Sequence, residues 1–226
     1  MRKPLPRVRA TRSLTVTRIA RSRLAKTAQM TVLFADLRGY TGLAEKLPPA
    51  SILPLLDEFF RVLTTATELH GGEVFHVAGD GMMAGFGMDD ASGEGARAAL
   101  AAGHAMLRDF AQLAERWRAE HAIETGVGVG LHTGEVALGV MGPPGRRHTT
   151  LVGDTVNVAA RLCGRARAGE VLLSYTVAAA LEAEPKRGKE KTGLGAFLHL
   201  PQFELRGRSA PLDIWCVPAA ARPTIS

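Results

Sequence analysis

Two aspartates stand at the ends of apolar runs, where a buried sheet has no need of a charge. Asp36 closes the run "MTVLFAD", and Asp80 lies in the glycine turn of "HVAGDGMMAGFG". Consecutive elements usually lie beside one another, so both carboxylates are expected at one edge of one sheet. Close carboxylates raise one another's pKa, and a divalent cation that also binds substrate phosphates removes that conflict. The pair therefore predicts a metal-assisted nucleotide site. The alternative is that Asp36 caps a helix and Asp80 only serves a turn.

The elements that would position these aspartates follow from the apolar pattern. Residues 30–36 are expected to form a buried strand, and residues 73–87 a hairpin around the Gly79-Asp80-Gly81 turn. A strand pair that turns near His132-Thr133-Gly134 is expected at residues 123–142. The other expected segments are helices at 48–72, 92–120 and in the second half of 149–166, strands at 169–174, 197–207 and 211–218, and a loop at 183–195.

This order of elements favours an α+β sandwich, with one mixed or antiparallel sheet and helices on one face. A single domain is expected at residues 29–219, between a basic arm at 1–28 and a short tail at 220–226. The composition is 46% hydrophobic and 22% charged, as in ordinary globular proteins. No apolar run approaches the ~20 residues of a membrane span.

The net charge of +6 belongs to the arm and not to a domain surface. Residues 1–27 hold nine of the 28 Lys and Arg residues and no acid, so the rest of the chain is slightly negative. This distribution does not predict a nucleic-acid partner. Three interpretations of the arm stay open: a solvated arm, a segment in weak contact with an anionic membrane surface, or a transit-like peptide. Cys163 and Cys216 lack CxxC or paired spacing, which argues against a disulfide framework or a zinc site and fits a reducing cytosol.

Five motifs in order carry a resemblance to a known family. They are "FADLRGYT", "HVAGDGMMAGFG", "GVGLHTGEV", "LVGDTVNVAARL" and "FELRGRSAPLDIWCV". Together they resemble the catalytic domain of class III adenylyl and guanylyl cyclases, from about Met30 to Val217. The resemblance implies a ferredoxin-like or palm-type sandwich, with a central, mostly antiparallel sheet and helices packed on it. It also implies conversion of a nucleoside triphosphate to its 3′,5′-cyclic monophosphate and pyrophosphate.

The same resemblance implies roles for particular residues. Asp36 and Asp80, with the backbone carbonyl of Leu37, match the residues that hold two Mg²⁺ or Mn²⁺ ions per active site. Asn157 and Arg161 match the pair that stabilises the transition state, and their spacing of four puts both on one face of a helix. In the family these two groups come from different chains, so a homodimer with shared sites is expected.

Arg206 stands where the family usually has a lysine that binds the terminal phosphates. Arginine keeps the charge and adds a bidentate fork.

Two positions correspond to the residues that contact the nucleotide base in this family, and they match the family to different degrees. His76 stands where ATP-using members usually carry a lysine, and Thr150 resembles the threonine of many bacterial adenylyl cyclases. A neutral imidazole can donate and accept a hydrogen bond, so it can still address adenine. The acidic residue and the cysteine that guanylyl cyclases carry at these positions are both missing, which makes ATP the expected substrate.

The leading hypothesis is therefore a homodimeric, cytoplasmic adenylyl cyclase, membrane-associated if it is part of a longer protein. One alternative is a nucleotide-binding regulatory domain with weak or no activity, favoured only by His76. The other is a guanylyl or mixed-base cyclase.

Overall fold

The computed structural model of the protein describes residues 25–88, 93–182, 197–203 and 211–218. Its helices and strands are, in chain order, β1 (Lys26–Arg38), α2 (Tyr40–Lys46), α3 (Pro49–Leu69), β2 (Glu73–Ala78), β3 (Gly81–Phe86), α4 (Glu94–His121), β4 (Gly126–Met141), β5 (His148–Val152), α5 (Asp154–Arg165), β6 (Glu170–Ser174), α6 (Tyr175–Glu182), β7 (Leu198–Phe203) and β8 (Leu212–Pro218).

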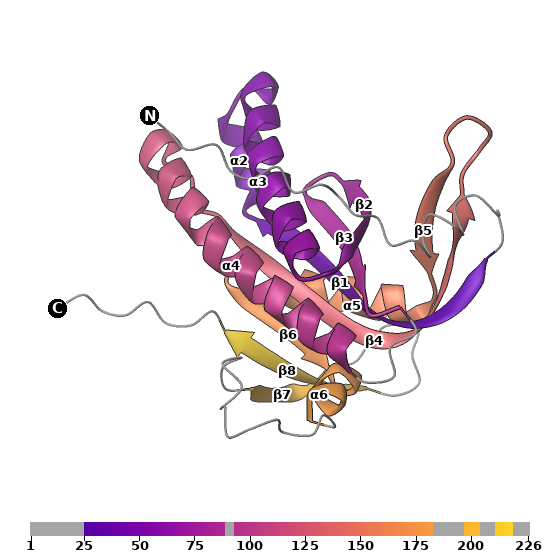
Figure 1. Ribbon diagram of the computed structural model, residues 1–226. Coiled ribbons are helices and arrows are strands. Elements are labelled where there is room, and N and C mark those ends of the chain that lie inside the picture. Colours follow the sequence, from indigo (N-terminus) through magenta and orange to yellow (C-terminus); the bar gives the residue numbers. More distant parts are fainter. Residues whose placement is uncertain (1–24, 89–92, 183–196, 204–210, 219–226) are drawn as a thin grey trace.

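One eight-stranded sheet organises these elements (Figure 1). Its order is β2-β3-β1-β4-β6-β8-β7, and β5 extends from β4. All described pairs are antiparallel except β4 with β6. The chain order is β1-α3-β2-β3-α4-β4, and the spatial order of these strands is β4-β1-β3-β2. This is the ferredoxin-like arrangement of two split βαβ units, joined by the β2–β3 hairpin. The expected α+β sandwich with a mostly antiparallel sheet is confirmed.

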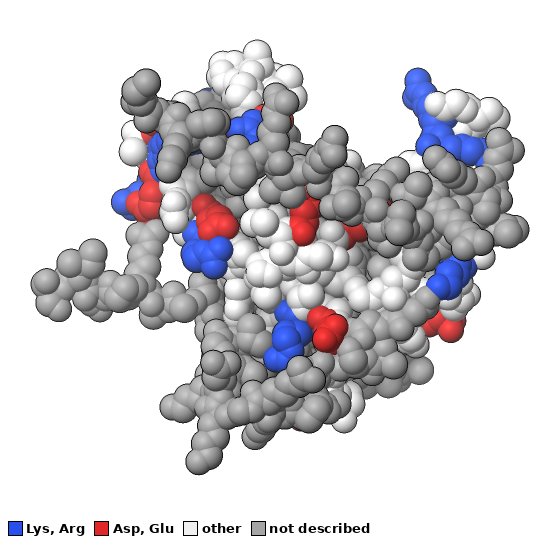
Figure 2. Space-filling view, in the orientation of Figure 1, with Lys and Arg blue, Asp and Glu red and all other residues white. Residues whose placement is uncertain are grey.

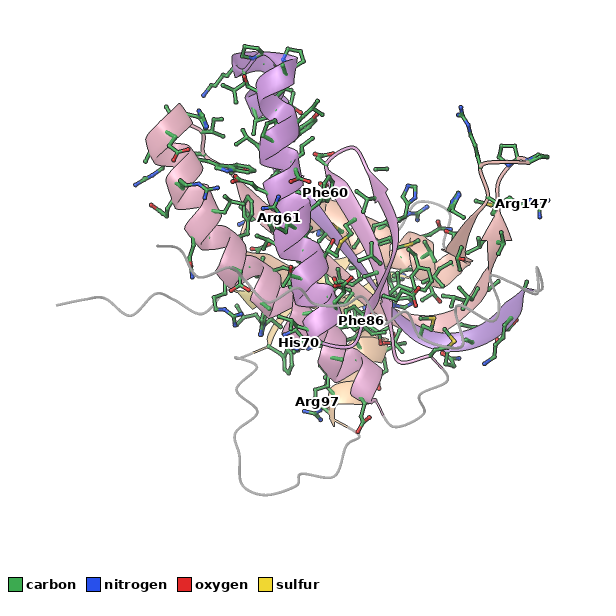
Figure 3. All side chains as sticks on the ribbon, turned by 45° about the horizontal axis from the view of Figure 1, so that its top comes forward. Phe60, Arg61, His70, Phe86, Arg97 and Arg147 are labelled. Carbon is green, nitrogen blue, oxygen red and sulfur yellow. The ribbon has the colours of Figure 1, made fainter. Side chains whose placement is uncertain are left out.

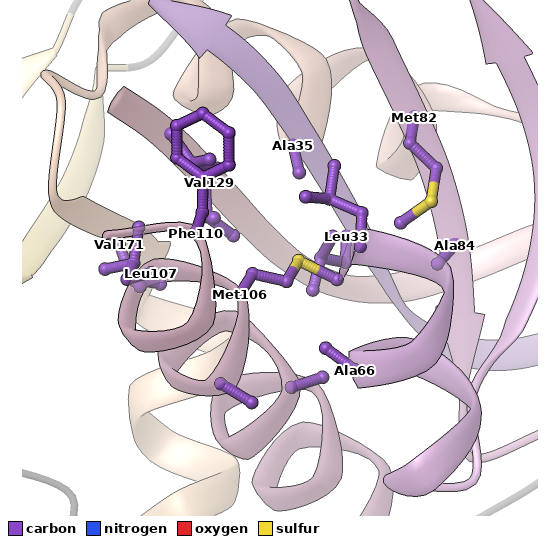
Figure 4. Packing of buried hydrophobic residues seen from close by; sticks show 14 of the residues in the cluster. Leu33, Ala35, Ala66, Met82, Ala84, Met106, Leu107, Phe110, Val129 and Val171 are labelled. Atoms are coloured by element: carbon purple, nitrogen blue, oxygen red, sulfur yellow. The ribbon is translucent and has the colours of Figure 1, made fainter. Parts of the chain in front are cut away.

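Helices cover both faces of this sheet, which corrects the expectation of helices on one face. On one face α3 and α4 pack on β1, β3 and β4 through a core that includes Ala66, Met106 and Phe110, seen from close by in Figure 4. The opposite face is covered by α5, whose Leu162 packs in a cluster with Leu172 of β6. Both faces are covered because β1 points apolar side chains alternately to each face of the sheet. Each of these apolar faces needs helices to bury it.

β4 runs without interruption from Gly126 to Met141, so the expected turn near residues 132–134 is wrong. The three residues there look like a turn because two of them are polar. Their polar groups are instead bonded inside the sheet: His132 Nδ1 lies 2.7 Å from Ser174 Oγ, and Thr133 Oγ1 lies 2.7 Å from Thr31 Oγ1. Satisfied hydrogen bonds allow polar side chains in a buried strand.

Two short helices, α2 and α6, were not expected from the sequence, while the expected loop at 183–195 lies outside the described residues. No helix of the described residues is long and apolar enough to cross a membrane. On the face in Figure 2, most described Lys and Arg side chains lie beside acidic ones, whereas the group at the upper right, on the arm of β4 and β5, has no acidic side chain next to it in this view.

Candidate active site

Asp36 and Asp80 meet at the end of the β1–β3 pair. Asp36 is the third residue from the end of β1 and lies opposite Gly81 of β3 and Gly128 of β4. The backbone N–H of Leu37 donates to the carbonyl oxygen of Asp80 at 3.1 Å, which ties the end of β1 to the turn between β2 and β3. The structure therefore brings the two sequence-predicted carboxylates together at one edge of the sheet.

The turn that carries Asp80 is a two-residue hairpin loop between Ala78 and Gly81, which pair with each other. Gly79 has a φ of 60°, while Asp80 does not have a positive φ. This is the pattern of a type II′ turn, whose twist suits antiparallel strands and which places glycine first. Glycine at this turn therefore fixes the direction in which the next residue, Asp80, leaves the sheet.

The charge of Asp80 affects the pKa of Asp36. Burial raises the pKa of Asp36, the charge of Asp80 raises this pKa further, and the Arg38 guanidinium lowers it again with a smaller effect. Asp36 does not cap a helix, because the N-cap of α2 is Gly39, which makes no side-chain cap bond. The Asp80 carboxylate accepts no hydrogen bond from the residues that the structure describes. The helix-cap interpretation of Asp36 is thus wrong.

The oxygen atoms of Asp36, Asp80 and Leu37 are suitable ligands for a divalent cation. In an antiparallel strand the N–H and C=O of one residue point to the same side, so the Leu37 carbonyl points toward the Asp80 turn, as its N–H does. Two carboxylates and a carbonyl are oxygen ligands of the kind that Mg²⁺ takes, and substrate phosphates complete its shell. The described residues hold no cluster of three or more His, Cys, Asp or Glu side chains for a metal. An ion here would therefore depend on oxygens from the substrate.

Arg38, which sequence reasoning missed, contacts Asp36 directly. Nη1 of Arg38 is ion-paired with Asp36 Oδ2, and the two side chains are 23% and 30% exposed. The signal was present in the sequence, because residues two apart on a strand share a face. The guanidinium also reaches the end of α5, where Nε donates to the carbonyl oxygen of Ala166 at 2.8 Å.

Asn157 and Arg161 lie together on the outer face of α5. Both residues are exposed, while the face of α5 toward the sheet buries Thr155, Val158, Ala159, Leu162 and Cys163. The helix approaches the sheet so closely that a Cβ on Gly130 would lie 2.1 Å from the backbone nitrogen of Cys163. The Asn157–Arg161 pair consequently points away from the sheet that carries Asp36. One chain does not bring the two halves of the predicted site together.

The two predicted base-reading residues lie on strands that do not pair with each other, since β2 pairs with β3 and β5 pairs with β4. His76 of β2 is exposed, and its ring centroid lies 6.2 Å from that of His148 on β5. Thr150 lies two residues further along β5, opposite Gly139, and is 7% exposed. Arg206 lies outside the described residues. Figure 3 shows Arg147 at the tip of the arm formed by β4 and β5.

Solved structures with this fold are nucleotide cyclases. The adenylyl cyclase CyaB from Pseudomonas aeruginosa is 27% identical with a TM-score of 0.78, over 88% of this chain and 98% of that chain. The guanylyl cyclase Cya2 is 25% identical with a TM-score of 0.73, over 89% of this chain and 97% of that chain. The fold and the arrangement of the site thus define a class III nucleotide cyclase catalytic domain.

Sequence comparisons agree. The family described as the adenylate and guanylate cyclase catalytic domain matches residues 23–210, and the chain belongs to this family. An adenylate cyclase of Anabaena cylindrica is 34% identical over 148 residues, 62% of this chain and 28% of that protein. An uncharacterised protein of Mycobacterium tuberculosis is 35% identical over 156 residues, 68% of this chain and 28% of that protein. The chain thus matches less than a third of the length of these relatives.

Proposed function

We propose that the protein is an adenylyl cyclase that converts ATP to 3′,5′-cyclic AMP and pyrophosphate at sites shared between two copies of the chain. One observation carries the proposal. A chain of this family keeps both carboxylates at one sheet edge and the Asn157–Arg161 pair on the outer face of α5. A regulatory domain freed from catalysis would have no chemical need for this set.

Each residue contributes a defined action. The Asp36 and Asp80 carboxylates and the Leu37 carbonyl would hold two Mg²⁺ or Mn²⁺ ions, which supply charge neutralisation of the triphosphate and activation of the ribose 3′-hydroxyl. The Asn157 amide orients the ribose by hydrogen bonding, and the Arg161 guanidinium stabilises charge that develops on the α-phosphate. Arg206 would bind the terminal phosphates.

The homodimer follows from the direction of α5. Because its outer face points away from Asp36 of the same chain, the Asn157–Arg161 pair can act only on a nucleotide held by another copy. A symmetric dimer provides this contact twice, since in an isologous interface each chain offers the same surface to the other. Two equivalent sites per dimer are therefore proposed.

ATP is the proposed substrate because of the residues at the base positions. His76 offers a ring nitrogen at an exposed place on β2, and Thr150 offers a hydroxyl on β5. A guanylyl cyclase remains the second candidate, because the solved neighbours include the guanylyl cyclase Cya2 as well as an adenylyl cyclase.

The direct test is a product assay with ATP or GTP and Mn²⁺ or Mg²⁺, followed by chromatography. Cyclic AMP from ATP with little cyclic GMP from GTP is expected. Asp80→Ala should abolish turnover without loss of the folded state, measured by circular dichroism, because the carboxylate makes no hydrogen bond to the described part of the chain. Cyclic GMP as the main product would favour the guanylyl alternative. No product with either nucleotide would favour the regulatory domain, and full activity of Asp80→Ala would remove the metal assignment.

A further inference from the structure

We propose that Arg38 is a positioning residue that holds the Asp36 carboxylate and the C-terminal end of α5 in one arrangement, and so serves both active sites of the homodimer. The inference rests on the proposed function, because it takes Asp36 and the Asn157–Arg161 pair as site residues. It adds a connection between the two half-sites of a single chain.

The Arg38 guanidinium makes polar contacts in three directions. Nη1 pairs with Asp36 Oδ2, Nε donates to the carbonyl oxygen of Ala166, and Nη2 donates to the carbonyl oxygen of Cys163. The two carbonyls belong to the last turn and the C-cap of α5. The Cys163 carbonyl also accepts from the Ala166 N–H at 3.0 Å, and the helix ends at this C-cap residue, so Arg38 supplies donors where the helix has few left. A positive charge is also favourable at a helix C-terminus. Arg38 is therefore a side-chain cap of α5 that is bonded to Asp36 at the same time.

The neighbouring strand leaves space for this side chain. A Cβ on Gly128 would lie 2.6 Å from Nε and 2.7 Å from Nη2 of Arg38, and 2.9 Å from the carbonyl oxygen of Ala166. Any larger residue at position 128 would thus displace the guanidinium from the gap between β4 and the end of α5. With its guanidinium confined there, Arg38 contacts Asp36 from a fixed position.

Only arginine has donors that suit the three acceptors. Its planar fork presents five N–H groups in fixed directions, whereas the lysine ammonium is a single point on a flexible stem. With the side chain 23% exposed, water competes little for these contacts. Arg38→Lys would keep the charge near Asp36 but would lose at least one of the α5 carbonyls.

The two groups that Arg38 joins work in different active sites. Asp36 belongs to the site that holds metal on its own chain, while α5 presents Asn157 and Arg161 to the site of the partner. A shift of the α5 C-terminus would move the outer face of this helix, and a turn of the Asp36 carboxylate would change the metal ligands. One side chain therefore sets the geometry of one component of each site.

The first test measures the Mn²⁺ dissociation constant by electron paramagnetic resonance, together with the Mn²⁺ activation constant, kcat and KM for ATP. It uses Arg38→Met, which keeps the apolar stem and removes the donors. Loss of residues that orient metal ligands typically costs 10–100-fold in metal affinity or activity. We expect both Mn²⁺ constants to rise about tenfold and kcat to fall 10–100-fold, with KM changed less than about twofold. Arg38→Lys should recover part of the metal affinity. An unchanged activation constant in a folded Arg38→Met protein would overturn the contact with Asp36 as a functional one.

Arg61→Met is the matched control. Arg61 lies on α3 (Figure 3) and forms an exposed ion pair with Asp57. The substitution is the same, but the lost ion pair lies on the outside of a helix and touches no site residue. Activity and the activation constant should stay at wild-type values, since exposed pairs of this kind contribute little.

The second test separates the two roles in heterodimers purified with two affinity tags. A chain with Asp36→Ala paired with a chain with Asn157→Ala leaves one complete site, with Asp36 from the second chain and Asn157 from the first. Arg38→Met in the second chain disturbs the intact Asp36, and in the first chain it disturbs the α5 that carries the intact Asn157. We expect at least a tenfold loss in both placements.

The outcomes are distinct. Loss in only one placement would overturn the double role, and loss in neither would overturn the proposal as a whole. No activity from the heterodimer without the Arg38 change would instead reject the shared site. In that case the role of Arg38 in the partner's site falls with it, and the metal activation constant of Arg38→Met still tests its role beside Asp36.

Discussion

At the scale of single residues, the Asp36 carboxylate is repelled by the charge of Asp80 and attracted by the charge of Arg38. The Asp36 carboxylate lies half-buried beside Asp80, so its charged form is disfavoured, and Arg38 only partly offsets this. A cation at this edge would relieve the conflict. The thiol of Cys163 lies nearby but takes no part, because burial raises its pKa to about 12 and leaves it protonated at neutral pH. It donates to the carbonyl oxygen of Gly128 at 3.3 Å.

Base selectivity is predicted to depend on His76. In His76→Lys, a charged donor replaces a ring nitrogen at the position where the family usually has lysine. We expect the ratio of kcat/KM for ATP over GTP to rise about tenfold, as one hydrogen bond from a charged donor is worth about 1.5–3 kcal/mol. Initial rates of cyclic nucleotide formation with both substrates measure this ratio.

His148→Lys is the control for His76→Lys. It places the same charge on β5, at the residue whose ring centroid lies 6.2 Å from that of His76. A general attraction for triphosphates would change both substrates alike and leave the ratio as it is. An unchanged ratio in His76→Lys as well would mean that His76 does not select the base.

At the scale of elements, the contact between α5 and β4 decides where the Asn157–Arg161 pair points. Gly130 lets the helix backbone lie directly on the strand, since a Cβ there would meet the Cys163 nitrogen at 2.1 Å and the Ala159 oxygen at 2.5 Å. These are backbone atoms that cannot rotate away. The helix is fixed further at its start, where Thr155 Oγ1 donates to the carbonyl oxygen of Glu135 at 2.7 Å.

Gly130→Ala is predicted to push α5 off the sheet. Overpacking of this kind costs about 1–3 kcal/mol or more, so we expect a loss of about 3 kcal/mol in the free energy of unfolding. Activity should fall as well, because the outer face of α5 moves. Chemical denaturation followed by circular dichroism measures the first effect, and the product assay measures the second.

Gly164→Ala tests whether the effect of Gly130→Ala comes from the contact. Gly164 lies in the same α5, is exposed, and a Cβ there would meet nothing within 4 Å. Because alanine is the better helix former, the free energy of unfolding should rise by up to about 1 kcal/mol. Equal destabilisation by both substitutions would contradict the account of the close contact.

At the scale of the whole molecule, the long helix α4 forms part of the core on one face of the sheet. It carries His104, a histidine whose protonation is expected to destabilise the folded protein. Nε2 of His104 is buried and has no hydrogen-bond partner in the described part of the chain. Burial lowers the pKa of His104, and the charge of Arg108 lowers it further. Protonation is thus harder in the folded protein than in the unfolded chain.

Global stability should therefore fall on acidification partly through His104. A lowered pKa in the folded state means that the unfolded chain binds the proton more readily, so stability present above the usual histidine pKa of about 6.5 is lost as pH falls below it. We expect the free energy of unfolding of wild type to drop more between pH 7.5 and pH 5.5 than that of His104→Gln. Denaturant titrations at the two pH values measure the difference.

A second variant guards against a local packing effect of the amide. His104→Leu removes the titrating group and suits an apolar surrounding, so it should show the same reduced pH dependence as His104→Gln. Parallel losses in wild type and both variants would show that other groups account for the acid sensitivity.

The sequence by itself determined the carboxylates, the hairpin turn, the long helices and the family. These signals are local, because strand and helix periodicity and turn chemistry depend on residues a few positions apart. The turn expected near residue 133 failed for the same reason, since polar residues read locally as a loop while their partners Thr31 and Ser174 lie far away in the chain.

Only the tertiary structure decided the features that join distant segments. Arg38 meets Cys163 and Ala166 across more than a hundred residues, and Gly130 shows its use only when α5 lies on it. Likewise, the spacing of Asn157 and Arg161 places them on one helix face, but which way that face points depends on which side of the helix is buried. Such contacts follow from the order of the strands in the sheet, and local propensities do not encode that order.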